Sequence, residues 1–270
     1  MRIKDKKRFM LACGGLATIL ILMITVLTIG FWNRNDNQAK TDNNTKSQTT
    51  AVANESETAV NSQAAVTEQP SETKEEIKNA SSADINSTDS ITKLVNKNHS
   101  ISSNYRPADL VTVDLPSTRD TQLRSVAIAG LTNLFEAAEA EGYELFCCSG
   151  YRSYETQTEL YAWNVETYGV DGAELVSARP GMSEHQLGLA MDVTSASVEF
   201  DLLESFGSTP EGQFIKENAH KFGFIVRYPQ GKTDITGYAY EPWHLRYLGI
   251  DVATDIYKSG KTMEEYYGTN

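Results

Sequence analysis

Two short stretches of the sequence hold side chains that could together bind a metal ion. The stretch from Ser183 to Asp192 contains a histidine, His185, and ends in the aspartate seven positions later. Near the C-terminus, a Glu-Pro-Trp-His sequence adds Glu241 and His244. Two imidazoles and a carboxylate that leave a fourth position open, with another carboxylate nearby, are what a catalytic zinc site requires. The residue types therefore indicate the chemistry of a zinc hydrolase.

The other two histidines have surroundings that argue against a role in the same site. His99 stands in a polar stretch, Asn96 to Ser100, and we expect it to be an exposed bystander. His220 lies in a segment that we expect to be helical, which favours a structural role. His185 alone would have the same interpretation, and it is the presence of both motifs, in order, in one domain that indicates a site.

Five short stretches around these residues follow a recognisable pattern. They are Ser149–Ser153, Pro180–Gly188, Ala190–Asp192, Arg227–Pro229 and Glu241–Tyr247. With them the sequence resembles the zinc D-alanyl-D-alanine carboxypeptidase family of the VanY type, whose relatives are VanX-type D,D-dipeptidases and bacterial L,D-carboxypeptidases. The resemblance covers about residues 91–270, and no position expected to carry the chemistry departs from the family pattern.

The resemblance implies a ligand set and a general base. His185, Asp192 and His244 would hold Zn²⁺, and a water molecule would take the fourth position. Zinc lowers the pKa of a bound water to about 7, which makes hydroxide available at neutral pH. Glu241, three residues before His244, would take the proton of this water and later give it to the departing amine.

The same resemblance assigns residues to the substrate. Arg152 would stabilise the oxyanion of the tetrahedral intermediate, a role that suits a permanently charged donor. Gln157 and Ser183 would form hydrogen bonds with the terminal residue of the substrate and its carboxylate. Arg179 could help to bind that carboxylate, and a structural role for it is equally compatible with the sequence. We expect Glu184 to be solvated.

The first 32 residues predict an uncleaved membrane anchor. Residues 1–8 form a basic segment, and residues 9–32 are an unbroken apolar run of 24 residues. About 20 such residues span a bilayer as a helix, and a preceding basic cluster places the N-terminus in the cytoplasm. A cleaved signal peptide is the alternative, but its apolar core would be only about 7–15 residues long. We expect a single-pass protein of the cell membrane whose C-terminal domain is extracellular.

Residues 33–90 have a composition unlike that of the C-terminal part of the chain. They are rich in Asn, Thr, Ser, Ala, Gln and Glu, they include no aromatic residue, and their only large aliphatic residues besides valines are Ile77 and Ile85. Such a segment buries too little apolar surface to offset the loss of chain entropy on folding. We expect a disordered extracellular linker, followed by one folded domain over residues 91–270.

The folded domain mixes helices and strands. The periodicity of apolar residues predicts helices over residues 118–141, 154–168, 211–222 and 250–259. Short apolar runs predict strands over residues 143–148, 189–193, 224–228 and 243–247. Because helices and strands do not alternate regularly, we expect a single α+β zinc peptidase domain with a mostly antiparallel sheet flanked by helices.

Composition argues against nucleic acid as a partner and against a disulfide framework. Beyond residue 8 the chain has 19 basic and 35 acidic residues, a net charge of −16, and nucleic-acid binding requires clustered basic residues. Cys147 and Cys148 are adjacent and would point to opposite faces of a strand, and the chain has no Cys spacing typical of metal sites. We expect buried, inert thiols rather than a strained vicinal disulfide.

The sequence therefore predicts a membrane-anchored zinc metallocarboxypeptidase outside the cell. By the resemblance it would remove the terminal D-Ala from peptidoglycan precursors or stem peptides ending in D-Ala-D-Ala, and it could contribute to glycopeptide resistance by destroying the target of these antibiotics. One alternative is an L,D-carboxypeptidase acting on tetrapeptide stems. Another is a non-catalytic cell-wall-binding module, although such a module would not need Glu241. The lack of a visible outer-membrane or cell-wall sorting signal suits a Gram-positive cell.

Overall fold

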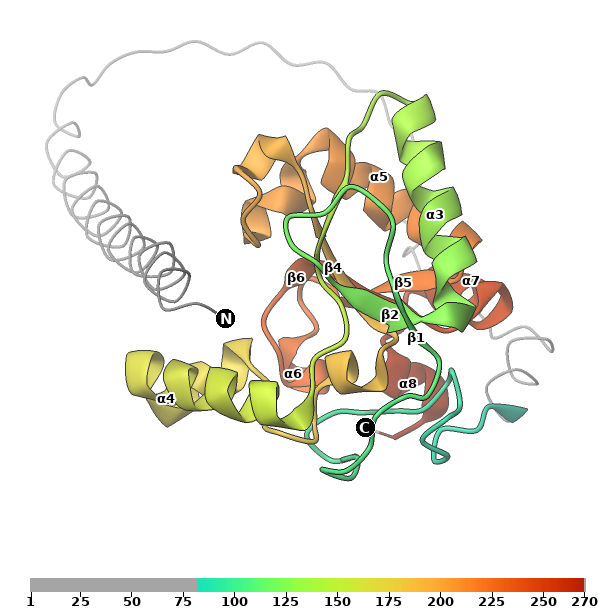
Figure 1. Ribbon diagram of the computed structural model, residues 1–270. Helices are drawn as coiled ribbons and strands as arrows, with labels where there is room; N and C mark the ends of the chain where they lie inside the picture. Colours follow the sequence, from blue (N-terminus) through green and yellow to red (C-terminus); the bar gives the residue numbers. More distant parts are fainter. Residues whose placement is uncertain (1–81, 270) are drawn as a thin grey trace, which may run out of the picture. The chain divides into compact units, whose positions relative to one another are not determined.

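The computed structural model describes residues 82–269 (Figure 1). The predicted basic segment, membrane anchor and most of the predicted linker lie outside these residues, so those assignments stay predictions. Among the described residues, no helix combines the length and apolar character needed to cross a membrane. The described part is an α+β domain in which helices flank an antiparallel sheet, as the sequence predicts.

A four-stranded sheet forms the centre of this domain. Its strands lie in the order β3-β4-β6-β5, and neighbours pair in antiparallel fashion. Their bounds are β3 Phe146–Ser149, β4 Ala190–Thr194, β5 Phe224–Tyr228 and β6 Glu241–Tyr247. A second sheet has two short antiparallel strands, β1 (Leu110–Thr112) and β2 (Gln122–Arg124). The four predicted strands are thus present, and the two short ones were not predicted.

Six helices of the described residues surround the sheet (Figure 1). They are α3 Ser125–Ala140, α4 Tyr154–Val176, α5 Pro210–Asn218, α6 Thr233–Thr236, α7 Ile250–Ser259 and α8 Met263–Tyr267. Four short 3₁₀ turns lie between them, η1 Glu184–Leu187, η2 Ala196–Val198, η3 Glu204–Ser208 and η4 Ala219–Phe222.

Three predicted helices have different ends in the structure. The helix predicted over 118–141 begins only at Ser125, because the chain before it pairs with β1 as β2. The helix predicted over 154–168 does break at Gly169, whose φ of 72° is not helical, but a second helical segment that the sequence did not predict follows it to Val176. The helix predicted over 211–222 ends at Asn218 and continues as the 3₁₀ turn η4.

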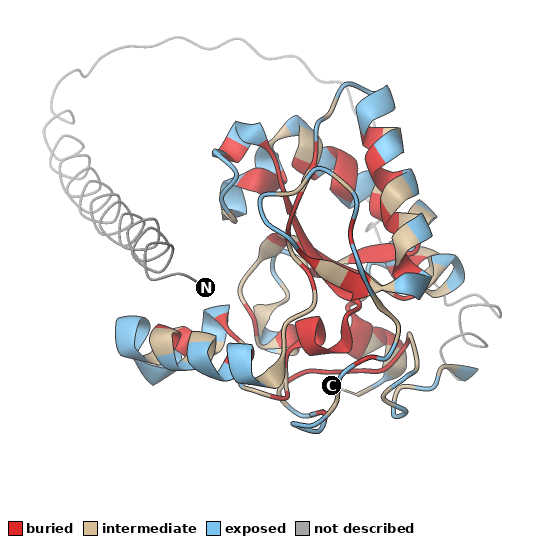
Figure 2. Ribbon diagram, in the orientation of Figure 1, coloured by how far each residue is buried: buried red, intermediate tan, exposed pale blue. Residues whose placement is uncertain are grey.

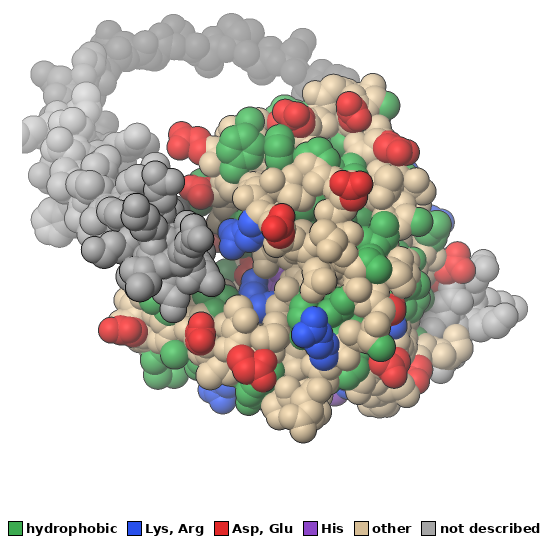
Figure 3. Space-filling model, viewed as in Figure 1, with side chains coloured by type: hydrophobic (Ala, Val, Ile, Leu, Met, Phe, Trp, Pro, Cys, Tyr) green, Lys and Arg blue, Asp and Glu red, His purple; other side chains and the backbone are tan. Residues whose placement is uncertain are grey.

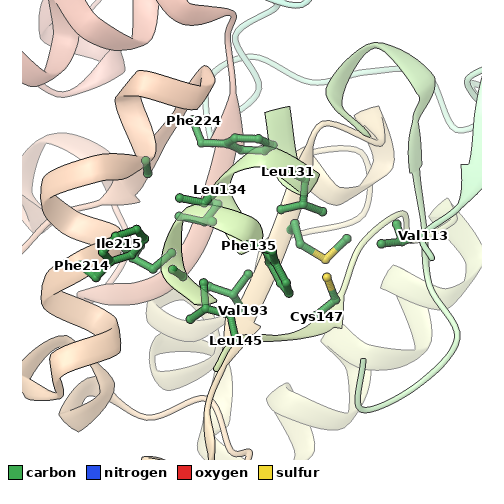
Figure 4. Packing of buried hydrophobic residues seen from close by; sticks show 14 of the residues in the cluster. Val113, Leu131, Leu134, Phe135, Leu145, Cys147, Val193, Phe214, Ile215 and Phe224 are labelled. Carbon is green, nitrogen blue, oxygen red and sulfur yellow. The ribbon is translucent and has the colours of Figure 1, made fainter. Parts of the chain in front are cut away.

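The apolar core covers one face of the central sheet. Helices α3 and α5 contribute Leu131, Leu134, Phe135, Phe214 and Ile215, which pack together with Phe224 of β5 and Val193 of β4 (Figure 4). Burying one such side chain fully contributes about 1.5–3 kcal/mol to folding. Figure 2 shows this concentration of buried residues along the strands and the inner faces of the helices.

Alternation along the strands separates this core from the charged residues. The core contains alternate residues of three strands, Met191, Val193, Phe224 and Leu245. Because successive side chains of a strand point to opposite faces, Asp192, His244 and Arg246 lie on the face away from the core. The sheet therefore has one apolar face and one face that carries the candidate chemistry.

A second apolar cluster joins the beginning of the described chain to its end. Leu94 packs with Ile225 of β5 and with Ile256 and Met263 of the two C-terminal helices, and Ile85 lies against the same cluster. The backbone N–H of Leu94 also donates to the carbonyl of Ile85, 3.1 Å away. Residues 82–90, which the sequence assigned to the linker, thus pack on the domain, and the folded part begins before residue 91.

The two adjacent cysteines are buried and free, as predicted. Both lie in β3, and Cys147 belongs to the main core. Burial raises the pKa of the Cys147 thiol to about 12, so this thiol stays protonated at neutral pH.

Candidate metal centre

The strand pairing places two predicted metal ligands opposite each other. Asp192 of β4 and His244 of β6 are paired residues in the antiparallel ladder. His185 lies in η1, immediately before β4, and the chain between them turns at Gly188 in the left-handed region, with φ of 65°. A Cβ at Gly188 would also lie 2.8 Å from a methyl group of Leu110, so glycine suits this turn on both grounds. The turn brings the third ligand beside the other two.

The distances between these side chains fit a tetrahedral metal site. His185 Nε2 lies 3.3 Å from Asp192 Oδ2, and His244 Nδ1 lies 3.2 Å from Asp192 Oδ1. Ligand atoms about 2.0–2.1 Å from zinc in a tetrahedral site are about 3.3 Å apart. One ligand atom from each residue lies within 4.8 Å of the others, and this is the one such group among the described residues. The three side chains therefore fit Zn²⁺.

Asp192 carries a further sign of a metal ligand. Its Oδ1 atom is buried and accepts no hydrogen bond from any described residue, although His244 Nδ1 is close. Burial raises the pKa of Asp192, but the neighbouring His185 and His244 outweigh burial and hold the pKa well below its usual range. An ionised, buried carboxylate oxygen that lacks a donor is suited to a cation.

The backbone directly after β3 fixes the ring of His185. Its Nδ1 lies 2.8 Å from the carbonyl oxygen of Gly150, which can only accept, so Nδ1–H donates and Nε2 faces Asp192. Gly150 must be glycine here, because a Cβ would lie 2.3 Å from the carbonyl oxygen of Gln122 and 2.6 Å from Thr121 Oγ1. The structure thus leaves Nε2 of His185 as the ring nitrogen available to a metal ion.

His244 faces Asp192 with Nδ1, whereas His185 faces it with Nε2. Its Nδ1 faces Asp192 and also lies 3.5 Å from Glu241 Oε2, whereas its Nε2 lies 3.4 Å from Glu184 Oε2. Burial lowers the pKa of His244, but the Asp192 and Glu184 carboxylates outweigh burial and raise it to about 9. A metal ion bound at Nδ1 would displace a proton from this ring, as imidazole ligands require.

The prediction that Glu184 is solvated is wrong. Its side chain is fully buried, and its Oε1 accepts hydrogen bonds from Arg227 Nε and Arg246 Nη1, each 2.8 Å long. Burial raises its pKa, but the two arginines outweigh burial and hold the pKa well below its usual range. The sequence did contain a signal for this contact, because Arg227 and Arg246 stand in apolar strands, and a charge buried in a sheet requires a partner.

Glu241 lies at the first position of β6 and has a different environment. Its side chain is 14% exposed and is next to the ligand atom of His244. Burial raises the pKa of Glu241 to about 7; the nearby Asp192 carboxylate also raises it, while His244 opposes both. A carboxyl group with a pKa near neutrality can both accept and return a proton, and a bound cation would favour its ionised form.

Arg152 is held at the same site by its neighbours. Its guanidinium donates to Ser149 Oγ over 2.8 Å and to Gln157 Oε1 over 2.9 Å, and its backbone N–H donates to the carbonyl of His185 over 3.1 Å. Burial lowers the pKa of Arg152, and the nearby carboxylates of Asp192 and Glu241 oppose that effect. The guanidinium is therefore a fixed positive group beside the candidate ligands.

The two residues predicted to bind substrate have different surroundings. Gln157 is buried at the first turn of α4, and its amide is engaged by Arg152 on one side and by the carbonyl of Ala178, 2.6 Å away, on the other. Ser183 is buried directly before η1, and its Oγ has no hydrogen-bond partner among the described residues. In this arrangement Gln157 orients Arg152, and Ser183 keeps its hydroxyl available.

Three further polar residues lie outside the candidate metal centre. His99 is half-buried, with Nδ1 3.0 Å from Asn96 Oδ1, and the ring of His220 stacks on Tyr257 at 3.9 Å. Arg179 is exposed and pairs with Glu174 over 2.6 Å. His99 is thus less exposed than the sequence predicted, but both histidines lie outside the group formed by His185, Asp192 and His244.

The face that carries the site is hollowed. Figure 3 shows a depression above α4 in which histidine and Lys or Arg side chains are visible. Tyr228 lies beside the site, with its ring centre 4.9 Å from that of His244. A depression with polar side chains in it is suited to a small or extended substrate.

Comparisons with known proteins agree with this geometry. Residues 120–250 match the VanY D-alanyl-D-alanine carboxypeptidase family. YodJ of Bacillus subtilis (strain 168) is 45% identical over 188 residues, which cover 68% of this chain and 69% of YodJ.

Two solved carboxypeptidase structures are also similar to this chain. The LdcB LD-carboxypeptidase, whose structure describes peptidoglycan recognition, has a TM-score of 0.65 and 45% identity and covers 67% of this chain and 87% of its own. A mutant of the vancomycin-resistance D,D-pentapeptidase VanY in complex with Zn(II) has a TM-score of 0.53 and 37% identity. The match covers 65% of this chain and 97% of the VanY chain. Together with the ligand geometry of His185, Asp192 and His244, these similarities show that the chain belongs to the VanY D-alanyl-D-alanine carboxypeptidase family and is a zinc-dependent carboxypeptidase of that family.

Proposed function

We propose that this protein removes the terminal D-Ala from peptidoglycan precursors or stem peptides that end in D-Ala-D-Ala. The observation that carries the proposal is the set of three metal ligands with Glu241 beside His244 and Arg152 fixed close by. The similarity to a D,D-pentapeptidase structure that contains Zn(II) supports the D,D specificity.

In this proposal each residue has a separate task. Bound zinc would supply a Lewis acid and an acidified water molecule. Glu241 would take a proton from that water and pass it to the departing D-Ala amine, and a bound cation would favour the ionised form of Glu241 that accepts the proton. Arg152 would stabilise the negative charge that develops on the carbonyl oxygen of the peptide bond.

Substrate orientation falls to residues around this group. Ser183 offers a hydroxyl that has no partner among the described residues, two positions before the ligand His185. Gln157 would act on substrate mainly through Arg152, because both ends of its amide are already engaged within the chain. The terminal carboxylate of the peptide would be the group these side chains recognise.

A second candidate is an L,D-carboxypeptidase that removes D-Ala from tetrapeptide stems. The observation that favours it is the similarity to LdcB, which is higher in both identity and TM-score than the similarity to the VanY structure. Both activities use the same metal group and the same base, so the shape of the pocket around the penultimate residue would decide between them.

The predicted membrane anchor and linker fit this substrate. We propose that residues 9–32 hold the protein in the cell membrane and that the following segment lets the domain reach peptidoglycan outside a Gram-positive cell. Removal of the terminal D-Ala there would reduce the number of sites that glycopeptide antibiotics recognise. Proteolysis of intact cells and of ruptured cells would test the orientation: cleavage of the domain only after rupture would contradict it.

The test of the activity uses the full-length protein and two variants, Glu241→Ala and Glu139→Ala. Glu139 is an exposed residue of α3 and serves as the control. Each protein is analysed for bound zinc and incubated separately with a pentapeptide and a tetrapeptide stem, and released D-Ala is measured.

We expect the wild-type protein and Glu139→Ala to release D-Ala from the pentapeptide and Glu241→Ala to release none. All three proteins should contain bound zinc. Release from the tetrapeptide instead would transfer the assignment to the L,D-carboxypeptidase. A zinc-loaded wild-type protein that releases D-Ala from neither peptide would support the non-catalytic cell-wall-binding module.

A further inference from the structure

A chain of buried charged side chains lies directly behind the metal centre. Glu184, Arg227 and Arg246 are fully buried and Glu264 is 2% exposed. Arg227 links the two glutamates: its Nε donates to Glu184 over 2.8 Å, and its Nη1 and Nη2 donate to Glu264 over 2.9 and 2.5 Å. The four side chains form one connected unit, which we call the rear charge cluster.

Stability alone is a poor reason for such a cluster. Removing charges from water is costly, and replacing a buried ion network by apolar residues of similar volume is often neutral or stabilising. Arg227 and Arg246 also occupy strand positions beside apolar neighbours, where apolar side chains would pack readily. The position of the cluster next to a metal ligand suggests a task in the site.

The hydrogen bonds within the cluster orient one carboxylate. Glu184 Oε1 accepts from both arginines, which fixes the plane of the group. Its other oxygen, Oε2, is left facing His244 Nε2 at 3.4 Å. A carboxylate that accepts the second N–H of a metal-binding imidazole sets its tautomer and orientation and raises its basicity.

We propose that Glu184 is a positioning residue that holds His244 with Nε2 protonated and Nδ1 directed at the metal. His185 receives the equivalent support from the carbonyl of Gly150. The two histidines thus bind through different nitrogens, and each has its own acceptor behind it. Only the acceptor behind His244 carries a full charge.

Segments distant in the sequence brace this arrangement. Glu264 belongs to the C-terminal helix α8 and also accepts from Asn96 Nδ2 over 3.1 Å. Arg246 Nη2 donates to the carbonyls of Ile91 and Lys93 over 2.9 and 2.8 Å. The beginning and the end of the described chain therefore hold the two arginines that hold Glu184.

The inference deepens the proposed function, since it concerns the same metal centre. Its test measures zinc affinity and histidine tautomers, neither of which requires turnover. A failure of the carboxypeptidase assignment would therefore appear as zinc binding without D-Ala release, whereas a failure of this inference would appear as unchanged zinc binding in the Glu184 variant.

The first measurement uses wild-type full-length protein loaded with ¹¹³Cd and labelled with ¹⁵N in histidine. Scalar coupling between cadmium and nitrogen shows which ring atom is bound. We expect coupling to Nδ1 of His244 and to Nε2 of His185. Coupling to Nε2 of His244 would overturn the proposal whatever the behaviour of any variant.

The second measurement compares zinc affinity in Glu184→Gln, Glu264→Gln and Glu265→Gln by competition with a chelator. Loss of an acceptor behind a metal ligand typically weakens metal affinity about 10–100-fold, and we expect Glu184→Gln in that range. Glu264→Gln, one step further from the metal, should show a smaller loss. Glu265→Gln is the control, because Glu265 is the next residue of α8 but pairs with Lys232 outside the cluster.

Wild-type zinc affinity in a folded Glu184→Gln variant would overturn the proposal. If that variant does not fold, the cadmium coupling in the wild-type protein decides the tautomer, and Glu264→Gln decides whether the cluster supports the metal. An equal loss of affinity in Glu264→Gln and Glu265→Gln would mean that damage to α8 is responsible, and it would also overturn the proposal.

Discussion

Two glutamates approach the same histidine from opposite sides, and their environments give them opposite properties. Glu241 lies near Nδ1 of His244, is partly exposed, and burial raises its pKa to about 7. Glu184 lies near Nε2 and is fully buried, yet two arginines hold its pKa well below the usual range. The same side chain type thus has a pKa near neutrality in front of the candidate metal centre and remains ionised behind it.

The difference shows that burial alone does not set the charge of a carboxyl group. Desolvation favours the neutral acid in both residues, and only Glu184 has arginines within hydrogen-bond distance that reverse the effect. The front of the site is therefore suited to proton transfer, and the rear is suited to holding a ligand in place. Each side can be changed separately.

Removal of the metal should have the largest effect and should not depend on either glutamate. Dialysis of the full-length protein against a chelator is expected to abolish D-Ala release, and added Zn²⁺ should restore it. Because zinc binds the folded state, free zinc at 100 times its Kd would also stabilise the fold by about 2.7 kcal/mol. A peptidase assay and a thermal unfolding curve check both effects, and full activity in the metal-free protein would contradict the zinc assignment.

Glu241→Gln should separate catalysis from metal binding at the front of the site. General acid–base catalysis contributes about 10²–10⁴-fold to rate, so kcat should fall by a factor in that range while zinc affinity stays near the wild-type value. Measuring kcat together with chelator competition checks this, and the expected pattern is the reverse of that for Glu184→Gln. If Glu241→Gln bound zinc more weakly but the zinc-loaded variant kept the wild-type kcat, Glu241 would support the metal rather than act as the general base.

Arg152→Ala should have a somewhat smaller effect on the same reaction. Loss of one donor to an oxyanion costs about 10²–10³-fold in kcat, and zinc should stay bound, because Arg152 is not one of the three ligand residues and its loss removes a positive charge beside them. Arg179→Ala is the matched control, since Arg179 is exposed and pairs with Glu174 away from the metal. Equal kinetic losses in the two variants would argue against a specific role for Arg152.

The ligands and the sheet could be predicted because their signals are local. Strand β5 and helix α7 have the predicted bounds, since β5 is a short apolar run, α7 has a clear helical periodicity, and each ends at a turn. His185, Asp192 and His244 stood out by residue type and order, and the strand register then brought them together. The short strands β1 and β2 were missed, because three residues are too few to show an alternation.

The rear of the site could not be predicted in the same way. The burial of Glu184 depends on Arg227 and Arg246, which are 43 and 62 positions away, and these become neighbours only when β5 and β6 pair. The metal-binding nitrogen of each histidine likewise depends on a contact across the fold, such as the carbonyl of Gly150. Residue types identified the ligands, whereas their orientation required the structure.

The smallest effect that we expect concerns the outer end of the rear cluster. Burial raises the pKa of Glu264, but Arg227 outweighs burial, and the net pKa lies below the ordinary value of 4.5. A pKa lowered by folding stabilises the folded state above the unfolded value, and this contribution is lost as the pH falls through the folded value. Glu264→Gln should therefore cost about 1.5–3 kcal/mol at pH 7, the range for hydrogen bonds to charged groups.

This deficit should start to narrow as the pH falls below about 4.5, where Glu264 of the unfolded chain becomes protonated, and it should be lost at the lower pH at which folded Glu264 is protonated as well. Thermal unfolding of wild type, Glu264→Gln and the exposed control Glu139→Gln over a pH series checks the sign. A deficit that stayed constant at low pH would mean that packing of the side chain, rather than its charge, holds α8 against the domain. In that case the charge of Glu264 would not stabilise Arg227, and Glu184 would be the one carboxylate of the rear charge cluster whose charge does so.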